Sequence, residues 1–163
     1  MDFDGFYRDT SRRLLRYAYG LTGDPGEAQD LVQEAYARAW QRRRTLSGYE
    51  DPEAWLRLVV NRLATDRWRR LGVRRSRAQA TPPPDPVAPP SENVVLLVRA
   101  MRILPAAQRR ALALHYLLDR SVAEIAAETG VPTGTVKSWL SRGRAALAVH
   151  LGDTEPEGAG HAR

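Results

Sequence analysis

The chain has 163 residues, 43% of them hydrophobic, and a formal net charge of +6, which suits two small domains and a polyanionic partner such as nucleic acid. It contains no cysteine, so disulfide bonds, thiolate metal sites and cysteine nucleophiles are excluded. Its three histidines are scattered rather than clustered, and we therefore expect neither a metal nor a cofactor.

The first residues are not expected to form a targeting signal. They read Met-Asp-Phe-Asp, without the basic start of a signal peptide. No apolar run in the chain approaches the roughly 20 residues that a membrane helix needs. We therefore expect a cytoplasmic protein that is not inserted in a membrane.

Residues 1–71 predict a module of three helices. The first helix has its apolar residues on one face, namely Tyr7, Leu14, Ala18 and Leu21. The second begins at Asp24 and Pro25, because an acidic N-cap followed by a first-turn proline starts a helix. The third begins in the same way at Asp51 and Pro52. No strand pattern is found here or elsewhere, so the predicted fold class is all-α.

Residues 72–91 have the composition of a flexible linker. They contain three arginines and six prolines, and such a segment holds neither a regular helix nor a core. The linker would join the first module to a second small helical module at residues 92–151. The small, polar residues 152–163 are expected to form a disordered tail.

The second module is predicted to end in a helix-turn-helix. Ser121 and Glu124 are spaced as a capping box, which starts a helix by satisfying two backbone donors reciprocally. Gly130 stands where a left-handed residue would end that helix, and Pro132 suits the start of the next. Two short helices joined by so tight a turn are typical of this motif.

The second helix of this pair has a short, polar and basic face opposite its apolar stripe of Val136, Leu140, Gly143 and Leu147. Such a face can enter a major groove, where Arg and Lys bond to guanine edges or phosphates. A helical hairpin with a solvated basic face is the alternative. Trp139, at the edge of the apolar stripe, is expected to pack. The predicted DNA contacts are Thr135, Lys137, Ser138, Ser141 and Arg142.

Two helices of the first module carry polar surfaces opposite their apolar stripes. The second helix contains the run Asp-Leu-Val-Gln-Glu-Ala at residues 30–35, an acidic surface in an otherwise basic protein. The third presents a polar, cationic and aromatic stripe formed by Arg57, Asn61, Thr65, Trp68 and Arg69. Simple solvation of both faces is the alternative interpretation.

Three motifs in this order make the chain resemble bacterial RNA polymerase sigma factors of the small extracytoplasmic-function (ECF) group. They are the run at 30–35, a third helix with Trp-Leu-Arg at 55–57 and Arg-Arg at 69–70, and Gly-Thr-Val-Lys-Ser at 134–138. The resemblance covers residues 3–151.

The resemblance implies an initiation factor whose partners are core RNA polymerase and promoter DNA, both duplex and melted. It assigns polymerase binding to Asp30, Leu31, Gln33 and Glu34. It assigns the melted minus-ten strand to the third helix and the loop before it, through Arg57, Asn61, Thr65, Trp68, Arg69 and Arg70. It assigns recognition of the minus-35 element to the helix-turn-helix. An anti-sigma factor is a further candidate partner.

By the same resemblance, Asn61 lines a pocket for an extruded base. Extrusion costs a few kcal/mol, which hydrogen bonds to the base edge must offset, and an amide can both donate and accept. Trp68 could stack on a base or pack within the protein, and both interpretations stay open. Trp139 and Ser141 depart from the family, which often has Arg and a bulkier residue there, so one DNA contact is altered.

Two other classes of protein are alternatives. A dimeric helix-turn-helix regulator, not stably bound to polymerase, would explain the motif but gives no role to the acidic surface or the linker. A DNA-processing enzyme such as a recombinase needs a nucleophile with activating partners, and we find no such constellation. We therefore expect a protein that is not an enzyme.

Overall fold

The computed structural model describes residues 1–73 and 91–154, without the side chains of residues 71–73 and 153–154. Within the described residues it contains eight α-helices, a short π-helical segment and no strand, which confirms the all-α fold class. None of these helices is long and apolar enough to cross a membrane.

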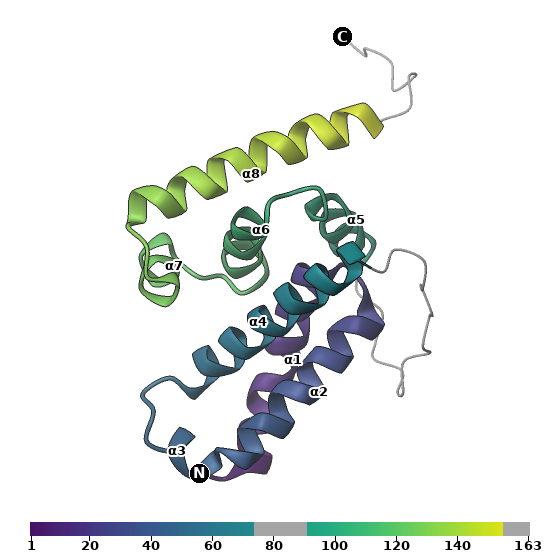
Figure 1. Ribbon diagram of the computed structural model, residues 1–163. Helices are drawn as coiled ribbons and strands as arrows, with labels where there is room; N and C mark the ends of the chain where they lie inside the picture. The colour runs from purple at the N-terminus through teal and green to yellow at the C-terminus, as the bar shows by residue number, and fades with distance from the viewer. Residues whose placement is uncertain (74–90, 155–163) are drawn as a thin grey trace.

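The first module is a helical bundle (Figure 1), formed by α1 (Phe3–Thr22), α2 (Pro25–Gln41), the one-turn α3 (Arg43–Leu46) and α4 (Pro52–Val73). The Asp24 side chain accepts a hydrogen bond from the Glu27 backbone N–H at 3.0 Å, as an N-cap of α2 should. Asp51 accepts from the Ala54 N–H at 3.0 Å and begins α4 in the same way. Both predicted helix starts are confirmed.

The apolar faces of α1, α2 and α4 meet in a core that includes Leu14, Tyr17, Leu31, Leu56 and Val60. Tyr7 differs from the expectation, because its side chain is 48% exposed. Its ring packs edge-on against Tyr36, with 4.7 Å between the ring centroids. At this position of α1 the ring therefore lies at the surface, packed against the buried Tyr36, while Phe3 and Phe6 pack against the core.

The second module contains α5 (Glu92–Met101), α6 (Ala106–Leu112), the π-helical segment Ala113–Leu117, α7 (Val122–Thr129) and α8 (Thr133–Thr154). The predicted capping box is present, with reciprocal hydrogen bonds of 3.1 Å between Ser121 and Glu124. Gly130 ends α7 with a φ of 74°, in the left-handed region that favours glycine. The helix-turn-helix is thus confirmed in α7 and α8.

Two helices continue beyond the predicted boundaries. The helix α4 reaches Val73 and α8 reaches Thr154, because extending an existing helix costs far less than starting one. Residues 74–90, most of the predicted linker, and residues 155–163, most of the predicted tail, lie outside the described residues.

The two modules pack directly against each other, which the sequence did not predict. In Figure 1, α5 and α6 lie between α8 and the first module, so that α8 is on the far side of the molecule from α2. A Cβ built on Gly20 of α1 would lie 2.6 Å from Leu117 Cδ1 and 3.2 Å from the Ala113 Cβ. Only glycine lets α1 approach the second module so closely.

Candidate nucleic-acid interface

The basic face of α8 is accessible. The apolar stripe beneath it is buried, with Val136 and Leu140 0% and 2% exposed. Three of the predicted contacts on the opposite side are exposed, namely Lys137, Ser141 and Arg142. The other two, Thr135 and Ser138, are half-buried. Trp139 is half-buried and packs against the core, as predicted.

One further cation of α8 was missed by the sequence interpretation. Arg144 is exposed and lies seven residues after Lys137, two turns along the same side of the helix. Its guanidinium donates a hydrogen bond to the Tyr116 hydroxyl at 3.1 Å. The spacing from Lys137 through Ser141 to Arg144 is the signal that could have found it.

The acidic surface of α2 is mostly where the sequence predicts it. Asp30, Gln33 and Glu34 are exposed. Leu31 is not part of this surface, because its side chain is 1% exposed and lies on the core side of α2. Glu34 forms an ion pair with Arg38, one turn along the same helix, at 3.0 Å. Because both side chains are exposed, this pair contributes at most about 1 kcal/mol to stability. The carboxylates therefore remain available to a partner.

The stripe predicted on α4 is only partly accessible. Arg69 and Arg70 are exposed, while Asn61 and Thr65 are half-buried. The Thr65 hydroxyl donates to the Asn61 backbone carbonyl at 2.9 Å, so its one donor is used within the helix and only its acceptor lone pairs remain for a ligand. Trp68 is 42% exposed, and the Arg109 guanidinium carbon lies 4.6 Å from the centre of its ring.

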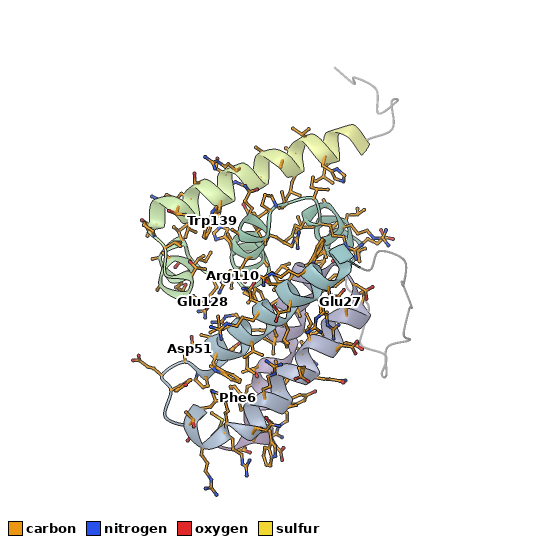
Figure 2. The ribbon with its side chains drawn as sticks, viewed as in Figure 1. Phe6, Glu27, Asp51, Arg110, Glu128 and Trp139 are labelled. Atoms are coloured by element: carbon orange, nitrogen blue, oxygen red, sulfur yellow. The ribbon has the colours of Figure 1, made fainter. Side chains whose placement is uncertain are left out.

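Arg57 is the main departure from the expected stripe. Its side chain is 3% exposed, because the second module covers it, and the sequence prediction that it faces outward is wrong for this arrangement. Two of its nitrogens donate to the Glu128 carboxylate of α7, with Nη2 to Oε1 at 2.6 Å and Nε to Oε2 at 3.1 Å. Figure 2 shows Glu128 on the side of α7 that faces α4.

The electrostatics around Arg57 keep its guanidinium charged. Burial would lower the pKa of Arg57, but the hydrogen bonds and charge of Glu128, with the nearby carboxylates of Asp51 and Glu53, raise it above its ordinary value. Arg120 joins the same cluster, with its Nη2 3.7 Å from Asp51 and 3.8 Å from Glu128. The cluster therefore links the start of α4 to α7.

A second missed feature is an aromatic cluster with arginine at the end of α2. Trp40 is 50% exposed, and the Arg43 guanidinium carbon lies 4.0 Å from the centre of its ring. Phe3 packs edge-on against Trp40, with 5.1 Å between the two ring centroids. Exposed aromatic rings interleaved with cations suit base stacking, and the Arg42–Arg44 run after Trp40 was the signal in the sequence.

Comparison with known proteins gives the family. The model of Sigma-70 region 2 matches residues 6–74, and that of Sigma-70, region 4 matches residues 95–147. The chain is 33% identical over 153 residues to the RNA polymerase sigma-E factor of Streptomyces coelicolor, covering 93% of this chain and 86% of that protein. It is 32% identical over 152 residues to the ECF RNA polymerase sigma factor SigL of Mycobacterium tuberculosis, covering 89% and 86%.

Among solved structures, the sigma factor RpoE from Bartonella quintana, crystallised with the anti-sigma factor NepR, has a similar fold. The TM-score is 0.73 at 26% sequence identity, and the likeness covers 94% of this chain and 99% of that one. It therefore spans both helical modules. The chain belongs to the ECF group of bacterial RNA polymerase sigma factors.

Proposed function

We propose that this ECF sigma factor divides promoter recognition between its two modules. The module at residues 1–71 binds core polymerase and captures the melted minus-ten strand, and the module at residues 92–151 grips the minus-35 element. The observation that supports this division most is that the two sigma-factor regions coincide with two helical modules, one with an exposed acidic surface on α2 and one with an exposed basic face on α8.

The polymerase contact would be made by Asp30, Gln33 and Glu34. These side chains are exposed on one face of α2, and Asp30 has only a weak partner in Arg67 of α4, at 3.9 Å. Leu31 would contribute indirectly, by holding α2 on the core. An acidic and amide surface on a basic protein suits a cationic surface on the polymerase.

The melted strand would be held by the accessible part of the α4 stripe. The half-buried Asn61 amide can bond to the edge of an extruded base, Trp68 can stack on a neighbouring base, and Arg69 and Arg70 can neutralise phosphates. Trp40, exposed at the end of α2, is a second aromatic ring on which a base can stack. Arg57 can join only when Glu128 releases it.

The minus-35 duplex would be read by α8, through Lys137, Ser138, Ser141 and Arg142, with Thr135 near the helix start and Arg144 one turn further along. Each phosphate that such a cation neutralises steepens the salt dependence of binding by about 0.9 in logarithmic slope. We propose further that the chain makes and breaks no covalent bond, that it acts in the cytoplasm, and that an anti-sigma factor can bind it.

The test is transcription of fragmented genomic DNA by purified core polymerase, with and without this protein, followed by sequencing of the transcripts. New, reproducible start sites are expected. Asp30→Ala with Gln33→Ala should weaken capture of core polymerase, whereas the control Asp9→Ala, on the exposed side of α1, should not. Asn61→Ala should impair promoter opening more than polymerase binding. Failure to bind core polymerase and to direct it to any template would contradict the proposal.

A further inference from the structure

The π-helical segment Ala113–Leu117 has no role in the function proposed above. Turns of this kind are rare and often lie at functional sites. This one is fixed where it ends, because the Arg120 backbone N–H donates to the Leu114 carbonyl at 3.0 Å. The His115 ring also donates, from Nδ1 to the Arg120 carbonyl at 2.8 Å, since a carbonyl oxygen can only accept. The backbone that carries Tyr116 is therefore held in one place.

Tyr116 combines an exposed side chain with a fixed ring. Its side chain is 46% exposed, and its ring packs edge-on against His115, with 4.8 Å between the ring centroids. Its hydroxyl accepts the 3.1 Å hydrogen bond from Arg144 Nη1. A phenol that accepts a hydrogen bond still has its own O–H to donate, and within the described residues this O–H has no acceptor. Tyr116 therefore presents an unused donor beside a guanidinium.

Arg144 is held by a neutral group, unlike several other arginines of the chain. Arg38 pairs with Glu34 and Arg120 with Glu124, so a carboxylate offsets each of those charges. Arg144 forms no such pair with any side chain that the structure describes, and its hydrogen bond goes to a phenol. This bond fixes the direction of the guanidinium without neutralising it. An oriented cation of this kind is suited to bind an anion.

The position of Arg144 on α8 indicates which anion this is. It follows Lys137 by seven residues on the same side of the helix, and it lies about 16 Å from the helix start at Thr133, at 1.5 Å per residue. Recognition helices contact bases through their N-terminal residues, in a major groove about 12 Å wide. A cation so far along the helix meets the edge of the groove, where the phosphates lie.

We propose that Tyr116 and Arg144 form an anchor for one phosphate of the minus-35 duplex. The phosphate accepts hydrogen bonds from the Arg144 guanidinium and from the Tyr116 O–H, while the bond between the two side chains holds the guanidinium in place. Tyr116 is thus a positioning residue as well as a contact, and it comes from outside the helix-turn-helix. The inference rests on the function proposed above for α8. It adds a contact that raises affinity without reading sequence.

The test uses the protein bound to core polymerase and a duplex from a promoter that the transcript sequencing identifies. Phosphates across the minus-35 element are replaced one at a time by uncharged methylphosphonates. At one position the replacement should weaken binding of the wild type about tenfold or more, because hydrogen bonds to a charged group are lost. In Arg144→Ala the same replacement should change binding less than about twofold, since the contact is already absent.

Tyr116→Phe tests the hydroxyl while keeping the ring and its packing on His115. Binding of the unmodified duplex should weaken about threefold to tenfold, and sensitivity to that methylphosphonate should fall. Combined with Arg144→Ala, it should weaken binding by less than the two single effects together, because Tyr116 acts partly through Arg144. Tyr7→Phe is the matched control, since its ring is 48% exposed and packs edge-on against Tyr36, and it should leave binding unchanged.

A pair that only stabilises the second module would give a different result. Tyr116→Phe and Arg144→Ala would then retain the wild-type sensitivity to every methylphosphonate, and this outcome would overturn the anchor while leaving the sigma-factor function intact. Wild-type affinity of both variants would also overturn it. Failure of the wild-type protein to bind core polymerase or to direct it to any template would instead overturn the proposed function, and the anchor with it.

Discussion

The two predicted DNA surfaces of this sigma factor, on α4 and α8, differ in what covers them. Both are polar and basic stripes opposite an apolar one, and both helices have 22 residues. On α8 the cations Lys137 and Arg142 are exposed, whereas on α4 Arg57 is buried against the second module. A helical pattern therefore predicts which residues share a face, but not whether another part of the chain occupies it.

The largest expected effect is the loss of stability when a buried side chain beneath the basic face of α8 is truncated. Leu140 is 2% exposed, and Leu140→Ala should lower the free energy of unfolding by about 2–5 kcal/mol, through lost burial and the cavity left behind. Chemical denaturation measures this loss. Val149→Ala, at a position on the same helix that is 66% exposed, should change stability by no more than about 0.5 kcal/mol. Equal losses of stability for the two variants would mean that α8 does not pack on the core through Leu140.

This contrast also shows how much the sequence could predict. The helix-turn-helix was predictable because its signals are local, with Ser121, Glu124 and Gly130 within ten residues. The Arg57–Glu128 contact joins residues 71 positions apart. The helical spacing of apolar residues does not predict a contact between two segments that a linker separates. Leu31 was assigned to polymerase from its place in a motif, although its position on the apolar stripe of α2 already indicated burial.

A double-mutant cycle can compare the closed contact with an ordinary surface pair. For Arg57 and Glu128 we expect a coupling of about 2–3 kcal/mol in the unfolding free energy, because the pair is bidentate and largely buried. Arg38 and Glu34 provide the matched control, an exposed pair at 3.0 Å that should couple by about 0.3–0.5 kcal/mol. Similar values for both pairs would contradict the closed interface.

Salt dependence distinguishes the two DNA surfaces in the free chain. Lys137→Ala and Arg142→Ala should each reduce the logarithmic salt slope of duplex binding by about 0.9, since each would remove one of the phosphate contacts proposed for α8. Arg57→Ala should leave this slope almost unchanged, because Arg57 is buried against Glu128 and lies on α4, outside the surface proposed to bind the duplex. Binding titrations over a range of salt concentrations measure these slopes. A drop with Arg57→Ala as large as with Lys137→Ala would contradict the assignment.

The smallest expected effect is a pH dependence at the cap of α7. The hydrogen bond from the Ser121 backbone, with those from the Ser121 hydroxyl and Arg120, lowers the pKa of Glu124 below its ordinary value of 4.5. A lowered folded-state pKa means that this stabilisation is present above pH 4.5 and is lost as the pH falls through the folded value.

Thermal unfolding between neutral and acidic pH tests the cap. Glu124→Gln should flatten the acid loss of stability, and Ser121→Ala, which keeps the backbone donor, should flatten it only in part. A pH profile unchanged by Glu124→Gln would show that the capping box does not contribute in this way.

The distance between the modules tests the central claim most directly. Spin labels on Asp9→Cys of α1 and Ala148→Cys of α8, both exposed, can be introduced without interference because the chain has no cysteine. Pulsed electron paramagnetic resonance should find one narrow distance distribution in the free protein and a different one when the protein is bound to core polymerase. A broad distribution in the free protein, or the same distance in both states, would contradict the packed interface between the modules and its opening on the polymerase.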